Sequence, residues 1–214
     1  MKSNLKYLYI LFAICILVLG CKDRKKDTRV FTTDDINPFM RGNVFHMGPK
    51  GYSIKVSRLQ WLVVKNKHKK VDLTLYNRIF PASVEVFAER NFRENLPLEK
   101  FLRKKLKRLF PKNYDLLEQN QILIAGENGF EMKAKGQIKL KEYKTSVPRI
   151  VKISVVQKNK ITYLFTFICK PEEFVNSTSD FALVLNNFKF EKITKPEFDE
   201  VIMDKLEQGK EFLR

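Results

Sequence analysis

The chain has 214 residues, with 41 Lys and Arg against 24 Asp and Glu, so its formal net charge is +17. Apolar residues make up 44% of the chain, which is enough to build a core and excludes an intrinsically disordered protein. Eight Gly and eight Pro exclude a collagen-like chain, and three Cys are too few for a disulfide-rich scaffold.

The first 21 residues have the pattern of an export signal. Lys2 and Lys6 precede an uncharged and largely apolar run from Tyr7 to Cys21. That run is shorter than the roughly 20 apolar residues that a membrane-spanning helix needs, and it fits the apolar region of a signal peptide. It ends in Leu-Val-Leu-Gly-Cys, which resembles the lipobox of bacterial lipoproteins, with Val18 where Leu is usual.

The lipobox resemblance implies that residues 1–20 are a lipoprotein signal peptide and that Cys21 becomes the lipid-modified N-terminus. A signal peptide without lipid, or a short membrane anchor with a chance Cys, is the alternative. The resemblance also implies an envelope location, and Lys22 after the modified Cys, in place of Asp, favours the outer membrane. Removal of residues 1–20 takes away Lys2 and Lys6 and lowers the net charge to +15.

The remaining chain is predicted to form three parts: a flexible tether over 21–42, an α+β body over 43–192 and a C-terminal helix within 193–214. Alternating and apolar segments predict strands at 44–47, 52–56, 61–64, 71–76, 82–89, 121–125, 130–140, 150–156, 161–169 and 188–190. The strand at 161–169 is apolar on both faces, which predicts a central position in the sheet.

Two helices and two turns complete the predicted body. Apolar residues at helical spacing predict a helix over 97–110, which Pro111 ends. Ser179 is expected to cap a second helix that has Phe181 and Phe188 on its apolar face. The segments Gly48–Gly51 and Asn128–Gly129 are expected to form tight turns.

The order of these elements resembles the PsbP-like group, which includes the photosystem II extrinsic protein and DcrB-like bacterial envelope lipoproteins. The segments that carry the resemblance are Gly51–Ile54, Trp61, Ala82–Val86, Leu98–Leu102, Ile124–Gly126, Ile161–Thr166, Pro171–Phe174 and Asn187–Phe190. The resemblance implies an α/β/α sandwich, an antiparallel sheet flanked by helices, and a non-catalytic accessory role. The usual closing Ser-Phe reads Asn-Phe here, and no residues match the metal ligands of the plant protein, so none are assigned.

No catalytic residue, metal site or cofactor is predicted from the sequence. The two histidines, His46 and His68, lie in a predicted strand and in a Lys-rich loop, without a motif for nucleophilic catalysis or zinc binding. Cys169 lies in an apolar run and is expected to be a small buried hydrophobic residue. Gly126–Gly129 reads as a hairpin turn and not as a phosphate-binding loop.

Two groups of cations are the candidate binding residues. The predicted helix carries Arg103, Lys104, Lys105, Lys107 and Arg108, and the loop before residue 71 carries Lys65, Lys67, Lys69 and Lys70. Such groups attract sulfated glycans, lipid phosphates or other polyanions, while the simpler interpretation is a solvated surface. Export makes nucleic acid an improbable partner.

Two functions are therefore open. The chain is either a non-catalytic interaction module that binds an envelope protein partner, or a surface lipoprotein that binds polyanions; an enzyme is a distant third.

The lipid modification can be tested directly. Cells that express the chain and are fed labelled palmitate should incorporate the label, and Cys21→Ala should abolish it because the acceptor thiol is gone. Cys15→Ala is the matched control and should keep the label. Label retained in Cys21→Ala would contradict the lipobox interpretation.

Overall fold

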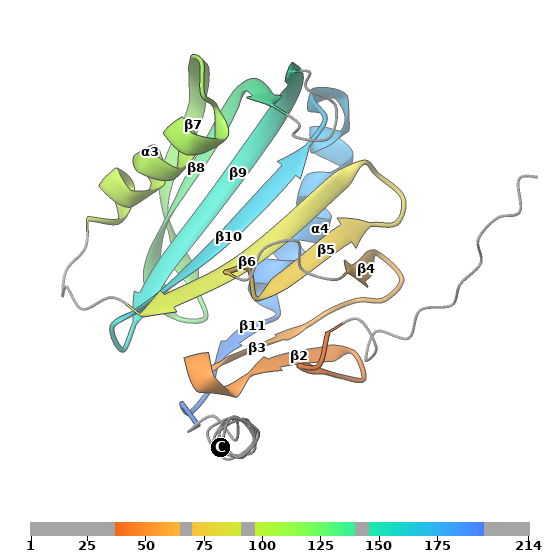
Figure 1. Ribbon diagram of the computed structural model, residues 1–214, viewed down its shortest axis with the longest axis vertical. Helices are drawn as coiled ribbons and strands as arrows, with labels where there is room; N and C mark the ends of the chain where they lie inside the picture. The colour runs from red at the N-terminus through yellow and green to blue at the C-terminus, as the bar shows by residue number, and fades with distance from the viewer. Residues whose placement is uncertain (1–36, 65–69, 91–96, 140–145, 195–214) are drawn as a thin grey trace, which may run out of the picture. The chain divides into compact units, whose positions relative to one another are not determined.

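The computed structural model describes residues 37–64, 70–90, 97–139 and 146–194. Seven antiparallel strands form the larger sheet, in the order β4-β5-β6-β10-β9-β8-β7 (Figure 1). Its strands are β4 (Trp61–Val64), β5 (Leu73–Asn77), β6 (Ala82–Arg90), β7 (Tyr114–Ile124), β8 (Glu127–Lys139), β9 (Ser146–Lys158) and β10 (Ile161–Cys169).

A second antiparallel sheet has the order β1-β2-β3-β11. Its strands are β1 (Met40–Arg41), β2 (Val44–Met47), β3 (Tyr52–Lys55) and β11 (Phe188–Phe190). The helices are η1 (Gly48–Lys50), α3 (Leu98–Leu109), η2 (Pro171–Glu173) and α4 (Phe174–Asn186). The predicted fold class, an α+β protein whose antiparallel sheet is flanked by helices, is confirmed, and the small sheet adds a second covering layer.

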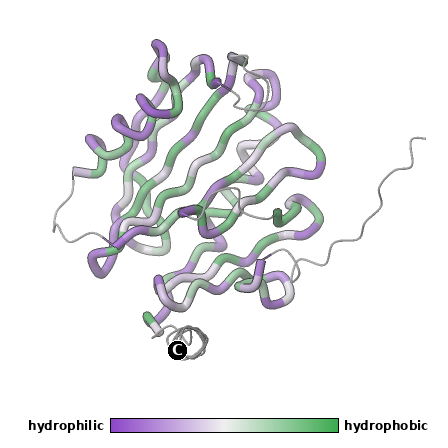
Figure 2. The backbone as a smooth tube through the Cα atoms, viewed as in Figure 1, coloured by the Kyte–Doolittle hydropathy of each residue, from purple (hydrophilic) through white to green (hydrophobic). Residues whose placement is uncertain are grey.

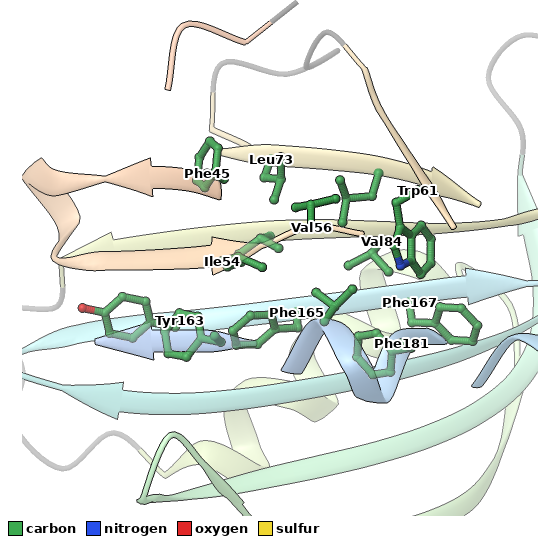
Figure 3. Packing of buried hydrophobic residues seen from close by; sticks show 14 of the residues in the cluster. Phe45, Ile54, Val56, Trp61, Leu73, Val84, Tyr163, Phe165, Phe167 and Phe181 are labelled. Atoms are coloured by element: carbon green, nitrogen blue, oxygen red, sulfur yellow. The ribbon is translucent and has the colours of Figure 1, made fainter. Parts of the chain in front are cut away.

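Strand β10 lies in the middle of the larger sheet, between β6 and β9, and is buried on both faces as the sequence predicts. On one face, Leu102 and Leu106 of α3 pack in a cluster with residues of β8, β9 and β10. On the other face, the small sheet and α4 cover Phe165 and Phe167, whose ring stacks on Phe181 at 5.1 Å (Figure 3). Figure 2 shows α3 alternating between hydrophilic and hydrophobic residues, as expected for a helix that lies on a sheet.

The hairpin between β7 and β8 turns earlier than the sequence predicts. Ala125 and Gly126 form the turn, with φ of 48° and 83°, and Ile124 pairs with Glu127. The predicted Asn128–Gly129 turn is wrong because these residues pair within β8, and a Cβ on Gly129 would lie 2.6 Å from the carbonyl oxygen of Val155. The absence of a side chain at Gly129 thus allows β8 and β9 to lie close together.

Helix α4 begins at Phe174 and not at Ser179. The η2 turn runs directly into it, and the Ser177 hydroxyl donates a hydrogen bond to the Glu173 carbonyl at 2.6 Å inside its first turns. Asp180 is therefore in mid-helix, where it accepts a hydrogen bond from Asn77 at 2.6 Å. Phe188, which the sequence placed both on the helix face and in a short strand at 188–190, lies in the strand, β11.

The folded body also begins before residue 43. Residues 37–42, which the prediction placed in the tether, include the buried Asn37 and Met40 and the strand β1. The signal peptide, the rest of the tether and the predicted C-terminal helix lie outside the described residues. Among the described residues, no helix has the length and apolar character needed to cross a membrane.

A buried carboxylate links the two sheets. Asp72, which precedes β5, accepts hydrogen bonds from the Lys50 ammonium, the Tyr52 hydroxyl (2.9 Å) and the Ala88 amide (2.9 Å). The Tyr163 hydroxyl in turn donates to the Lys50 carbonyl at 2.8 Å. Burial raises the pKa of the Asp72 carboxyl, and the Lys50 ammonium opposes this shift.

Replacing Lys50 should show how much its ammonium stabilises the buried Asp72 carboxylate. We expect Lys50→Met to lower the free energy of unfolding at pH 7 by about 3 kcal/mol, because it removes the Lys50 ammonium from a buried carboxylate. A carboxyl with a raised native pKa favours the native state at low pH, so the deficit should shrink as the pH falls through that pKa.

Urea unfolding between pH 4 and pH 8 would measure this difference. Lys189→Met, on the exposed residue of β11, is the control and should change the stability by less than about 0.5 kcal/mol. A deficit equal in both variants, or one independent of pH, would contradict the assigned role of Lys50.

Candidate functional site

A groove of about 770 Å³ lies between α3 and the face of the larger sheet formed by β6 and β10. Three cations, two carboxylates and several apolar side chains line it. The lining residues are Lys70, Val71, Glu85, Phe87, Glu89, Lys105, Arg108, Leu109, Leu164 and Thr166.

The groove exists because α3 covers one part of its face of the sheet. The helix packs on β8 and β9, whereas β6 and β5 extend beyond it on the far side of β10 (Figure 1). Alternation along β6 places Glu85, Phe87 and Glu89 on this face, opposite the buried core residues Val84 and Val86. Within the described residues, α3 does not extend over β6, which therefore presents polar side chains beside one aromatic ring on this face.

Lys105 is the most enclosed cation of the groove. Its ammonium lies 4.8 Å from the ring centre of Phe87 and 5.3 Å from that of Phe101, within the range of a cation–π interaction. Burial lowers the pKa of Lys105, the charges of Arg108 and Lys70 lower it further, and the Glu89 carboxylate opposes them. Lys105 is therefore a partly buried cation whose two neighbours in the groove carry the same charge.

The cations that the sequence predicts on the helix do not all face the same way. Lys105 and Arg108, three residues apart on one helix face, line the groove. Arg103 points elsewhere, because it pairs with Glu99 at 2.9 Å and donates to Gln119 of β7 at 2.8 Å. Lys104 and Lys107 are exposed. Lys107 borders a separate depression of about 450 Å³ that does not belong to the groove.

The loop cluster contributes one described residue, Lys70, which reaches the same groove as Lys105 and Arg108. The two cation groups that the sequence presents separately therefore meet at one place. Lys65, Lys67, Lys69 and His68 lie outside the described residues, as does Cys21.

His46, Cys169 and Ser154 lie outside the groove lining. His46 faces Glu191 at 3.5 Å in the small sheet. Cys169 is buried as predicted, and burial raises the pKa of its thiol to about 11. Ser154 is buried and donates to Glu131 at 2.7 Å. The described part of the chain holds no cluster of three or more His, Cys, Asp or Glu that could bind a metal ion.

Seven lining residues were not predicted as site residues from the sequence: Glu85, Phe87, Glu89, Val71, Leu109, Leu164 and Thr166. The alternation of residues 82–89 does place the first three on one face of a strand. That signal was available, but nothing local shows that the helix over 98–109 leaves this face open.

The electrostatics of the groove can be tested through Lys105. Arg108→Gln should raise the pKa of Lys105 because a neighbouring positive charge is removed, and Glu89→Gln should lower it because the opposing carboxylate is lost. NMR titration of isotopically methylated lysines would measure both shifts. Lys107→Gln, a change on the exposed side of α3, should have a smaller effect; shifts of one sign in both groove variants would refute this arrangement.

No protein-family model matches the chain, and no curated protein sequence matches it. The cyanobacterial PsbP protein CyanoP of Synechocystis sp. PCC 6803 is similar in structure, with 12% identity and a TM-score of 0.53 over 69% of this chain and 91% of that chain. The Ran-binding protein Mog1p of Saccharomyces cerevisiae has 8% identity and a TM-score of 0.49 over 72% of this chain and 97% of that chain. LpqN, involved in cell envelope biogenesis of Mycobacterium tuberculosis, has 9% identity and a TM-score of 0.47 over 75% of this chain and 98% of that chain. The likeness to CyanoP concerns the fold alone, and the fold of this chain is PsbP-like.

Proposed function

We propose that this chain is a lipid-anchored lipoprotein of the bacterial cell envelope, held in the outer membrane through Cys21, whose PsbP-like body is a non-catalytic interaction module. The N-terminal signal and lipobox pattern supports the anchor and the location, and the DcrB-like resemblance agrees with both. The partner under this proposal is another envelope protein.

The observation that carries the interaction role is the groove between α3 and β6. Its rim holds Lys70, Arg108 and Glu89, which are exposed, while Phe87 and Leu109 are half-buried within it. Charged residues of both signs around apolar side chains are the composition of a docking surface, in which the polar rim orients a partner and the apolar part supplies contact area.

The side chains that line the groove support the non-catalytic part of the proposal. Its lining has no Ser, Cys or His, and the hydroxyl group in it belongs to Thr166. Ser154 and Cys169 are buried elsewhere. A thiol whose pKa is raised to about 11 is protonated at neutral pH and is a poor nucleophile.

Binding of polyanions, such as glycosaminoglycan or envelope phosphate, is the second candidate. It is favoured by the meeting of Lys70 with Lys105 and Arg108, which brings cations from both basic segments to one site. Exposed Lys104 and Lys107 would extend that surface along the outside of α3.

Photo-crosslinking in intact envelopes would test the interaction role. A photoreactive benzoylphenylalanine placed at Lys70 or at Glu89 should give a discrete protein adduct, because both positions border the groove. The same group at the exposed Lys189 of β11 is the control and should give none. Adding Arg108→Glu to the Glu89 probe should reduce the adduct by reversing a rim charge.

Equal adducts at groove and control positions would contradict the proposed surface. An adduct displaced by soluble heparin in a salt-dependent way would favour the polyanion candidate over a protein partner.

A further inference from the structure

Three cations gather at one end of the groove: Lys70, Lys105 and Arg108. Lys50, Lys133, Lys152 and Lys158 each pair with an acidic residue on the sheets. Within the described part of the chain, no such ion pair engages Lys70, Lys105 or Arg108. Burial is the main cause of the lowered pKa of Lys105, and repulsion by the charges of Arg108 and Lys70 adds to it. An anionic group placed among them would relieve that repulsion.

The groove has an apolar part beside this cationic end. Leu164 of β10, 4% exposed, forms part of the floor, and the half-buried Leu109 and Phe87 stand on either side of it. The volume of about 770 Å³ lies in the range of sites for small organic ligands, roughly 300–1,000 Å³, and exceeds the space needed by a bare anion.

Two carboxylates limit the charge that a ligand can carry. Glu85 and Glu89 flank Phe87 on the same face of β6, so negative charge follows the strand along the groove. An extended polyanion that followed this strand would meet both carboxylates and lose by repulsion what it gained from the cations. A ligand with one anionic end and an uncharged apolar remainder avoids that repulsion.

We propose that the groove binds a single anionic amphiphile, with its phosphate-type or carboxylate head among Lys70, Lys105 and Arg108 and its apolar chain against Phe87, Leu109 and Leu164. The inference rests on the proposed use of this groove as the binding surface, and it assigns the groove a ligand of its own. It does not depend on lipid at Cys21.

A titration of the full chain in phosphatidylcholine nanodiscs would test this site. The probe is dihexanoylphosphatidic acid below its micelle concentration, followed through the NMR signals of isotopically methylated Lys105 and Lys70, with empty nanodiscs correcting for partition into lipid. We expect saturable shifts of both signals. Dihexanoylphosphatidylcholine, which has no net charge, and inorganic phosphate, which has no chain, should each bind at least about tenfold more weakly.

Variants separate the two halves of the ligand. Arg108→Gln should weaken phosphatidic acid binding about tenfold through loss of a charge-assisted contact. Leu109→Ala should weaken it about fivefold and leave the binding of inorganic phosphate unchanged, since it alters the apolar contact alone. Lys104→Gln removes one cation from the same helix outside the groove lining and should leave the affinity unchanged.

Three results would overturn the inference: equal binding of inorganic phosphate, equal binding of phosphatidylcholine, or an equal loss in Lys104→Gln and Arg108→Gln. The first indicates a free-anion site, the second an apolar site, and the third a diffuse cationic surface. Lipid binding without any protein adduct in the envelope would leave this inference standing and refute the protein-interaction role, whereas an adduct without lipid binding would do the reverse.

Discussion

The larger sheet must be covered on both faces because its central strand is apolar on both. Every residue of β10 except Ile168 is buried, and this strand lies between β6 and β9, so neither face can be left to solvent at the centre. The small sheet and α4 cover one face, and α3 covers the other. The second cover is incomplete, since α3 reaches β8 and β9 but leaves β6 uncovered. The groove is the consequence of that unequal covering.

Charge is distributed according to the same geometry. On the sheets, lysines are neutralised across neighbouring strands, as Lys133 is by Glu118 and Lys152 by Glu131. At the uncovered edge of α3, the cations come from two segments distant in sequence, and they meet without such pairs in the described part of the chain. Cations from two separate basic segments therefore gather at this groove.

The elements with strong periodicity could be predicted from the sequence. In the strand at 161–169 and the helix at 98–109, the spacing of apolar residues within the segment is enough to predict the element. Both were predicted to within one or two residues. The Ala125–Gly126 turn was missed because Asn128–Gly129 has a similar local preference and strand register decides between them. The start of α4 was missed because the η2 turn runs directly into the helix ahead of the expected cap at Ser179. The site was half predicted: its cations came from composition, but Glu85, Phe87 and Glu89 depend on β6 lying beside β10, a pairing across more than seventy residues that no local pattern reveals.

The order in which the strands pair also limits how early each sheet can be completed during folding. Strands β1–β3 pair among themselves and so do strands β4–β6, but the other edge of β3 pairs with β11 and the other edge of β6 pairs with β10. Neither sheet can therefore be completed until these C-terminal strands have been made. Loop closure over such separations is slow, and folding dominated by non-local pairs lags behind synthesis. For a chain that is exported as proposed, this delay has a use, because the cores of both sheets cannot close until the C-terminal strands have been made, which gives the polypeptide time to cross the membrane first.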